Sequence, residues 1–219
     1  MDPRLASLTG LQSLFAQCST LIPVDIRDLQ SSASHRTNIT FDAFVQFLTS
    51  DTNTPPACSY YAKDIHLERL FPASDLFCFP SEFADDWLGD YFKYLHPEDD
   101  YTFLYVGGPQ SSTGFHCDVL HSCSVSHNIT GAKLWTLWPP HPALRKLQEC
   151  DSNGYDNITL SKSLIEMPRS ELIQQEGETI FVPSGWFHTV QNLSPLVISV
   201  NKNWCTLSLL LVLFFNILS

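Results

Sequence analysis

The chain has 219 residues, of which 44% are hydrophobic and 16% charged, so it can form one folded domain with a sizeable core. Its formal net charge of −11 at pH 7 and its pI of about 4.9 make nucleic acid a poor direct partner. The same charge favours a basic protein or peptide as the partner.

The cysteine pattern and the two ends of the chain indicate the compartment. Seven cysteines are present without a Cys-x-x-Cys pair, which fits free thiols in a reducing compartment. Residues 5–15 are interrupted by polar side chains and do not form a signal-peptide pattern. The apolar segment 205–219 is shorter than the roughly 20 residues that a membrane span needs. We expect a cytoplasmic protein, with the nucleus as the alternative, and no membrane span.

The first hundred residues predict a mixture of helices and strands. Residues 1–20 form an N-terminal segment of uncertain structure, and 21–100 form a mixed α/β part that begins with a short strand over 21–24. Apolar residues at helical spacing predict a helix over 41–48 that Thr40 caps. A second helix is predicted over 85–95 by the same periodicity.

Residues 101–204 read as a series of short strands separated by turn signals. The expected strands are 101–106, 125–129, 132–138, 179–182 and 197–201. This pattern predicts a mainly β fold with flanking helices, of the jelly-roll or cupin-like type, in which strands distant in sequence lie together. The remaining segment, 205–219, is expected to be a divergent apolar tail.

One short motif in this region has the chemistry of a metal site. His116 and Asp118 alternate with Cys117, so in a strand both side chains point to the same face. His188, which follows a Pro-Ser-Gly turn, is the best candidate for a second imidazole. Two histidines and one carboxylate form the facial triad of non-haem Fe(II) oxygenases. For His116 taken alone, the alternative to a metal ligand is a partly buried histidine whose ring is held by a hydrogen bond. His121 and His127 are not expected to be ligands.

Further motifs accompany this one: Gly131-x-Lys133 before an aromatic strand, Val182-Pro-Ser-Gly-Trp-x-His188, and Asn201-x-Asn203-Trp204. Together they resemble the jumonji-C family of Fe(II)- and 2-oxoglutarate-dependent oxygenases. Within it, the likeness is to the subfamily of the fourth numbered jumonji-domain protein, a lysyl hydroxylase of the translation termination factor. The resemblance runs from about residue 21 to 204. It implies a double-stranded β-helix that binds Fe(II) through His116, Asp118 and His188.

The resemblance also implies which residues bind the cosubstrates, 2-oxoglutarate and O2. Lys133 and Thr113 stand where family members hold the far carboxylate of 2-oxoglutarate, although a lysine at a strand start also fits a surface position. Asn128 and Asn201 match polar positions near the cosubstrate in relatives. For each of these two asparagines a structural hydrogen bond is the alternative.

By this resemblance we expect a dioxygenase that hydroxylates a protein side chain, with a lysine of the translation termination factor as the target. A jumonji-C histone lysine demethylase would share every site residue named above, and a non-catalytic binding module of this fold is a third reading. Relatives continue past Trp204 into helices that often support dimerisation. Formation of a homodimer is therefore left open.

Overall fold

The computed structural model describes residues 1–31, 33–50, 57–72, 76–96, 100–152, 162 and 164–207. The strands are β1 (Ile22–Asp28), β2 (Ser34–Ile39), β3 (Cys58–His66), β4 (Thr102–Gly107), β5 (Ser112–Cys117), β6 (Cys123–Thr130), β7 (Lys133–Trp138), β8 (Ser170–Gln174), β9 (Thr179–Val182), β10 (Phe187–Asn192) and β11 (Val197–Trp204). The α-helices are α1 (Leu8–Phe15), α2 (Phe41–Thr49), α3 (Leu67–Leu70), α4 (Trp87–Leu95) and α5 (Pro142–Ser152). The apolar tail predicted over 205–219 lies outside the described residues from 208 onward.

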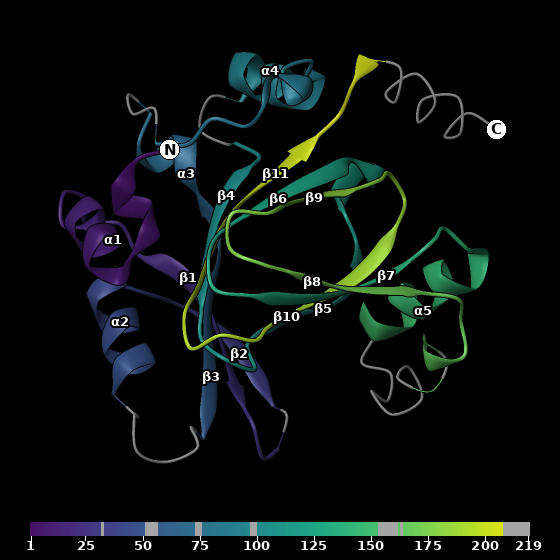
Figure 1. Cartoon of the computed structure of the whole chain (residues 1–219), viewed down its shortest axis with the longest axis horizontal. Coiled ribbons are helices and arrows are strands. Elements are labelled where there is room, and N and C mark those ends of the chain that lie inside the picture. The colour runs from purple at the N-terminus through teal and green to yellow at the C-terminus, as the bar shows by residue number, and fades with distance from the viewer. Residues whose placement is uncertain are drawn as a thin grey trace.

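The strands form two antiparallel sheets that enclose a barrel, as Figure 1 shows. The larger sheet has the order β2-β1-β3-β4-β11-β6-β9, and the smaller has the order β5-β10-β7-β8. Neighbouring strands are thus often far apart in the sequence, which is the arrangement of a jelly roll. The predicted fold class is confirmed. Because β3 pairs with β4, the N-terminal part and the barrel share one sheet; the division of the chain at residue 101 stays a prediction.

None of the helices in the described ranges combines the length and apolar character needed to cross a membrane.

The N-terminal helices cover the outer face of the larger sheet and build the main core. Thr40 caps α2, as predicted, because its hydroxyl accepts a hydrogen bond from the backbone N–H of Ala43. Phe44 of this helix is fully buried, and Phe15 of α1 stacks on Phe41 with ring centroids 4.4 Å apart. Truncating a buried phenylalanine costs about 3–5 kcal/mol, so this layer supplies much of the stability.

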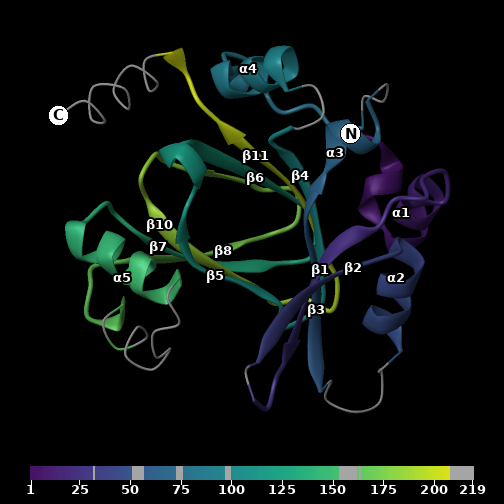
Figure 2. The same ribbon diagram turned by 180° about the vertical axis from the view of Figure 1, so that it is seen from behind.

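Helix α4 is fixed to the larger sheet at one end of the barrel. Asp86 caps it by accepting a hydrogen bond from the Gly89 N–H, which is why the helix begins at Trp87 and not at residue 85 as predicted. The Asp86 carboxylate also pairs with Lys202 of β11 at 2.7 Å. The backbone N–H of Trp87 donates to the carbonyl of Cys205. Figures 1 and 2 both place α4 beside the end of β11.

The smaller sheet brings together the strands that carry the predicted metal ligands. β10 pairs with β5 on one side and with β7 on the other. In this register His188 lies directly opposite His116. The outer side of this sheet packs through Phe187 and Trp138 against α5, whose Leu144 is buried. Helix α5 thereby covers the strands from outside, on the face opposite to His116 and His188.

Candidate metal centre

Three predicted ligands converge at one end of the barrel interior. One ligand atom from each of His116, Asp118 and His188 lies within 4.8 Å of the other two. The two imidazole rings have centroids 4.2 Å apart. Asp118 follows the last residue of β5 with extended backbone angles (φ −59°, ψ 150°), so it continues the alternation begun by His116. The cluster is half open to solvent, because His188 is buried and the other two residues are partly exposed.

The local environment favours imidazoles with a lone pair available for a metal. His116 Nδ1 lies 2.9 Å from the carbonyl oxygen of Gly114, an acceptor, so Nδ1 is the donor of this contact and Nε2 is the ring nitrogen left for a metal. Burial, with the nearby His116 as a second cause, lowers the pKa of His188 to about 4. His188 is therefore neutral at physiological pH. It can bind a cation without first losing a proton.

Both oxygens of the Asp118 carboxylate are held by hydrogen bonds. The hydroxyl of Ser124 donates to Oδ2 at 2.7 Å, and the amide of Asn203 donates to Oδ1 at 3.2 Å. Asn203 also donates to the hydroxyl of Ser122 at 3.0 Å. Sequence reasoning missed these partners as site residues. The polar residues at every second position of β11, Ser199, Asn201 and Asn203, were a signal that this strand turns a polar face inward.

The deep end of the same cavity holds a buried cation. Lys133 is 1% exposed, and its Nζ donates a hydrogen bond to the hydroxyl of Ser199. Burial lowers the pKa of this ammonium group to about 7. Among the described residues no carboxylate forms an ion pair with Lys133. A buried ammonium group without a counterion is costly, so the arrangement provides a strong place for an anion.

A β-bulge explains why Thr113 also faces this cavity. The register between β10 and β5 shifts between His188, which is opposite His116, and Val190, which is opposite Thr113. Thr113 and His116 are three residues apart and would face opposite sides of a regular strand. The extra residue turns both into the cavity, which they line together with Lys133 and Asp118. The side chain of Tyr61 lines the same cavity, and burial raises its pKa.

The two predicted asparagines occupy different places. Asn201 lines the cavity, and its Oδ1 accepts a hydrogen bond of 2.7 Å from Ser126. Asn128 is fully buried outside the cavity lining, and its amide donates to the carbonyl of Gly131 at 2.6 Å. Its visible contact closes the turn between β6 and β7. A role for either residue in cosubstrate binding stays a prediction.

The two histidines excluded from the predicted triad have other neighbours. His121 Nδ1 lies 3.6 Å from the sulfur of Cys117, and His127 Nδ1 lies 2.8 Å from the hydroxyl of Thr179. Neither belongs to the ligand cluster that the described residues form.

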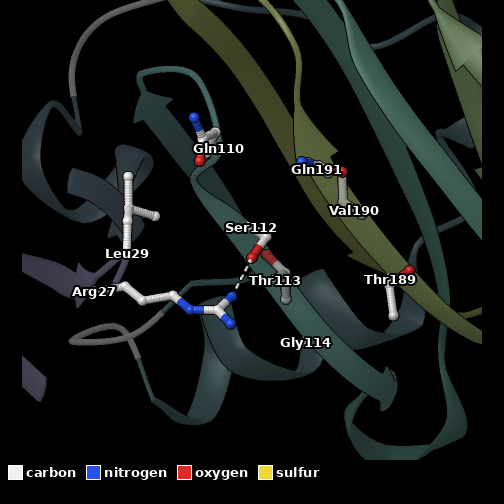
Figure 3. A pocket seen from close by; sticks show the side chains of 9 residues that line it. All are labelled: Arg27, Leu29, Gln110, Ser112, Thr113, Gly114, Thr189, Val190 and Gln191. Atoms are coloured by element: carbon white, nitrogen blue, oxygen red, sulfur yellow. Dashed lines mark hydrogen bonds between the residues drawn. The ribbon is translucent and has the colours of Figure 1, made fainter. Parts of the chain in front are cut away.

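A larger hollow of about 420 Å³ lies beside the beginning of β5 and the end of β10. Figure 3 shows Arg27 of β1 reaching across it toward Ser112, and the Arg27 guanidinium lies 3.5 Å from the Ser112 hydroxyl. Its lining includes Thr113 but none of the three ligands. The histidines and the carboxylate therefore mark the smaller interior cavity as the chemical centre.

Comparison with known proteins places this cavity in a family. The cupin-like domain family matches residues 23–208, which is most of the chain. The chain belongs to the cupin-like domain family, among its jumonji-C members.

Individual relatives of this cupin-like chain are oxygenases and demethylases by name. It is 40% identical over 177 residues to the 2-oxoglutarate and iron-dependent oxygenase JMJD4 of Danio rerio, covering 75% of this chain and 41% of the relative. It is 37% identical over 172 residues to the protein of the same name in Homo sapiens, covering 73% and 39%. It is also 36% identical over 164 residues to the arginine-specific demethylase JMJ20 of Arabidopsis thaliana, covering 66% and 35%. The chain spans about two fifths of the length of these curated relatives.

Proposed function

We propose that this chain forms the oxygenase domain of an Fe(II)- and 2-oxoglutarate-dependent protein hydroxylase. The observation that carries the proposal is that one interior cavity is lined both by the His116, Asp118 and His188 cluster and by the buried Lys133. A ligand triad at one end and a buried cation at the other suit a cosubstrate that chelates a metal and carries a second carboxylate. The names of the similar JMJD4 proteins support the same activity.

The donor set fits ferrous iron. Two imidazoles and one carboxylate on one side of a cation leave the opposite positions open, as in non-haem Fe(II) oxygenases. Bound iron would activate O2 at the expense of 2-oxoglutarate, which leaves as succinate and carbon dioxide. The chain's part is to hold the donors in place: Gly114 orients His116, and Ser124 and Asn203 fix the carboxylate of Asp118.

The cosubstrate's far carboxylate has a matching set of groups in this cavity. The ammonium group of Lys133 would supply the charge, and the side chains of Thr113 and Tyr61 line the same space. Pairing with a carboxylate stabilises the charged lysine and raises its pKa from the lowered value of about 7. The barrel wall, with Trp135 fully enclosed beside His188, keeps this end of the cavity shielded from bulk water.

For the substrate we propose a lysine of the translation termination factor. This assignment rests on the resemblance set out above and on the similarity to JMJD4 proteins. The net charge of −11 supports a basic partner, because opposite charge speeds encounter and fixes orientation.

A second candidate is demethylation of a basic residue, which the 36% identity to an arginine-specific demethylase favours. Demethylation begins with the same insertion of oxygen into a carbon–hydrogen bond, but the hydroxylated methyl group then leaves as formaldehyde. A third reading, a non-catalytic binding module, gains no support from a cavity that retains all three ligands and the buried lysine.

The experiment is a mass-spectrometric assay of the iron-loaded chain with 2-oxoglutarate and either the termination-factor domain or methylated histone peptides. We expect a stable gain of one oxygen atom on a lysine of the termination factor, without formaldehyde. Formaldehyde release from a methylated peptide, with no gain of oxygen on the termination factor, would replace the hydroxylase proposal by the demethylase one.

A further inference from the structure

A row of aromatic rings leads from the surface of the protein toward the metal centre. Tyr101 lies directly before β4, and Phe103 and Tyr105 follow it at every second position, so all three face the barrel interior. The ring centroids of Tyr101 and Phe103 are 6.0 Å apart, and those of Phe103 and Tyr105 are 6.4 Å apart. Phe92 of α4 extends the row outward, because its ring lies 4.6 Å from that of Tyr101. Tyr101, Phe103 and Phe92 are all partly exposed.

Strand register places this row beside the metal ligands. Phe103 lies opposite Asn201 on β11, and Tyr105 lies opposite Ser199. The backbone of Asn203 donates to the carbonyl of Tyr101, while its side chain donates to Asp118. Paired residues of an antiparallel sheet share a face. The rings of Tyr101 and Phe103 are therefore at the level of the triad, with Tyr105 deeper, near Lys133.

The row is suited to a positive charge. Lys133 Nζ already lies over the Tyr105 ring, 6.0 Å from its centroid. The Tyr105 hydroxyl donates to the Asp64 carboxylate at 2.7 Å, which makes the ring more electron-rich. A ring face attracts a cation through its quadrupole, and the methylenes of a lysine or arginine pack against the same face. The outer rings thus offer a second cation the contact that Tyr105 gives to Lys133.

Helix α4 sets the outer limit of this row. Its attachment through Asp86 and Lys202 and through the Trp87 backbone fixes Phe92 against Tyr101. Tyr94, on the opposite side of the same helix, is 85% exposed and points away from the row. Phe92 therefore belongs to the row of rings, whereas Tyr94 does not.

We propose that Phe92, Tyr101 and Phe103 form a binding wall for the basic side chain of the protein substrate. The methylenes of the side chain lie along the rings and its charge sits over a ring face, while the backbone that carries it stays at the α4 end of the barrel. This inference rests on the proposed function for the role of the metal centre and adds the residues that select a lysine or arginine. An apolar side chain would lose the charge-dependent part of the contact.

The first test measures binding without turnover. The full chain, labelled with fluorophenylalanine, is titrated with capped lysine amide and with capped norleucine amide, and the fluorine resonance of Phe103 is identified by its absence in Phe103→Leu. We expect the Phe103 resonance to shift with the lysine probe at concentrations about three- to thirtyfold lower than with the norleucine probe. Equal responses to the two probes, or no response to lysine, would overturn the proposal even if the chain proves to be an active hydroxylase.

The second test uses turnover. Phe103→Leu keeps an apolar side chain but removes the ring, and is expected to raise KM for a lysine-containing substrate about three- to thirtyfold. Thermal unfolding of Phe103→Leu shows that the variant is folded. Tyr94→Leu is the matched control and should leave KM unchanged. If neither substitution changes KM, the proposal of a binding wall is wrong. If the chain binds the lysine probe but shows no turnover, only the proposed function is contradicted.

Discussion

At the scale of single residues, the unusual feature of the site is a buried lysine, Lys133, that pairs with no carboxylate in the described part of the chain. The charged form of Lys133 is favoured in the unfolded chain up to its ordinary pKa of 10.5, but in the folded chain only up to about 7. Between these values the unfolded state binds more protons, so the protein gains stability as pH rises from about 7 toward 10.5. Below the lower value the full cost of the buried charge is present.

Lys133→Met therefore has two opposite effects. We expect the ligand-free variant to melt at a higher temperature than wild type, with a larger gain at pH 6 than at pH 9. Its affinity for 2-oxoglutarate should fall about ten- to a hundredfold, as expected for the loss of a charge-assisted contact of about 1.5–3 kcal/mol. Thermal unfolding and equilibrium binding check the two effects. A variant that melts lower at both pH values would mean that the lysine is already paired.

The partners of Asp118 give a prediction about metal affinity. Ser124→Ala and Asn203→Ala each free one oxygen of the carboxylate, and such outer partners typically contribute about ten- to a hundredfold in metal affinity. Titration with Fe(II) or Mn(II) under anaerobic conditions measures this loss. Ser126→Ala, on the same strand but bonded to Asn201, is the control and should bind metal like wild type. Equal metal affinity in all three variants would show that metal binding by Asp118 does not depend on these hydrogen bonds.

At the scale of elements, one carboxylate makes two of the contacts that hold α4. Asp86 caps the helix and pairs with Lys202, whose side chain is only 19% exposed. Asp86→Ala removes the cap and leaves the lysine without its partner, so we expect a loss of about 3 kcal/mol in the free energy of unfolding.

Urea denaturation of Asp86→Ala measures this loss. The control is Asp90→Ala, because Asp90 is an exposed aspartate on the same helix. We expect its free energy of unfolding to stay within about 0.5 kcal/mol of the wild-type value. If both variants unfold at the same urea concentration, α4 is held by its apolar contacts and not by Asp86.

The elements also show which parts of the site the sequence predicts. His116, Asp118 and His188 could be found because few residue types bind metals and the strand period places the first two together. Thr113 needed the family resemblance, because its direction depends on a bulge that strand periodicity does not reveal. Ser199 and Tyr61 reach Lys133 and Thr113 only through pairings between distant strands. The helix over residues 8–15 was left unassigned, although Leu8, Leu11 and Phe15 follow a helical period.

At the scale of the whole molecule, the barrel explains how a site is assembled from strands far apart in the chain. The class of fold could be predicted because short strands with turn signals are typical of a jelly roll, and the strand order could not, because it is fixed by contacts between distant residues. The family match over residues 23–208 covers every strand that lines the cavity. The described part of the chain therefore contains a complete set of candidate ligands for iron and for 2-oxoglutarate.

The central claim is that this cavity turns over 2-oxoglutarate through a metal held by His116, Asp118 and His188. The most direct measurement is succinate formation by the iron-loaded chain and by Asp118→Ala, with thermal unfolding to show that both are folded. We predict succinate from wild type, more of it when the protein substrate is added, and none above background from Asp118→Ala. Equal succinate formation by the two folded proteins would contradict the account.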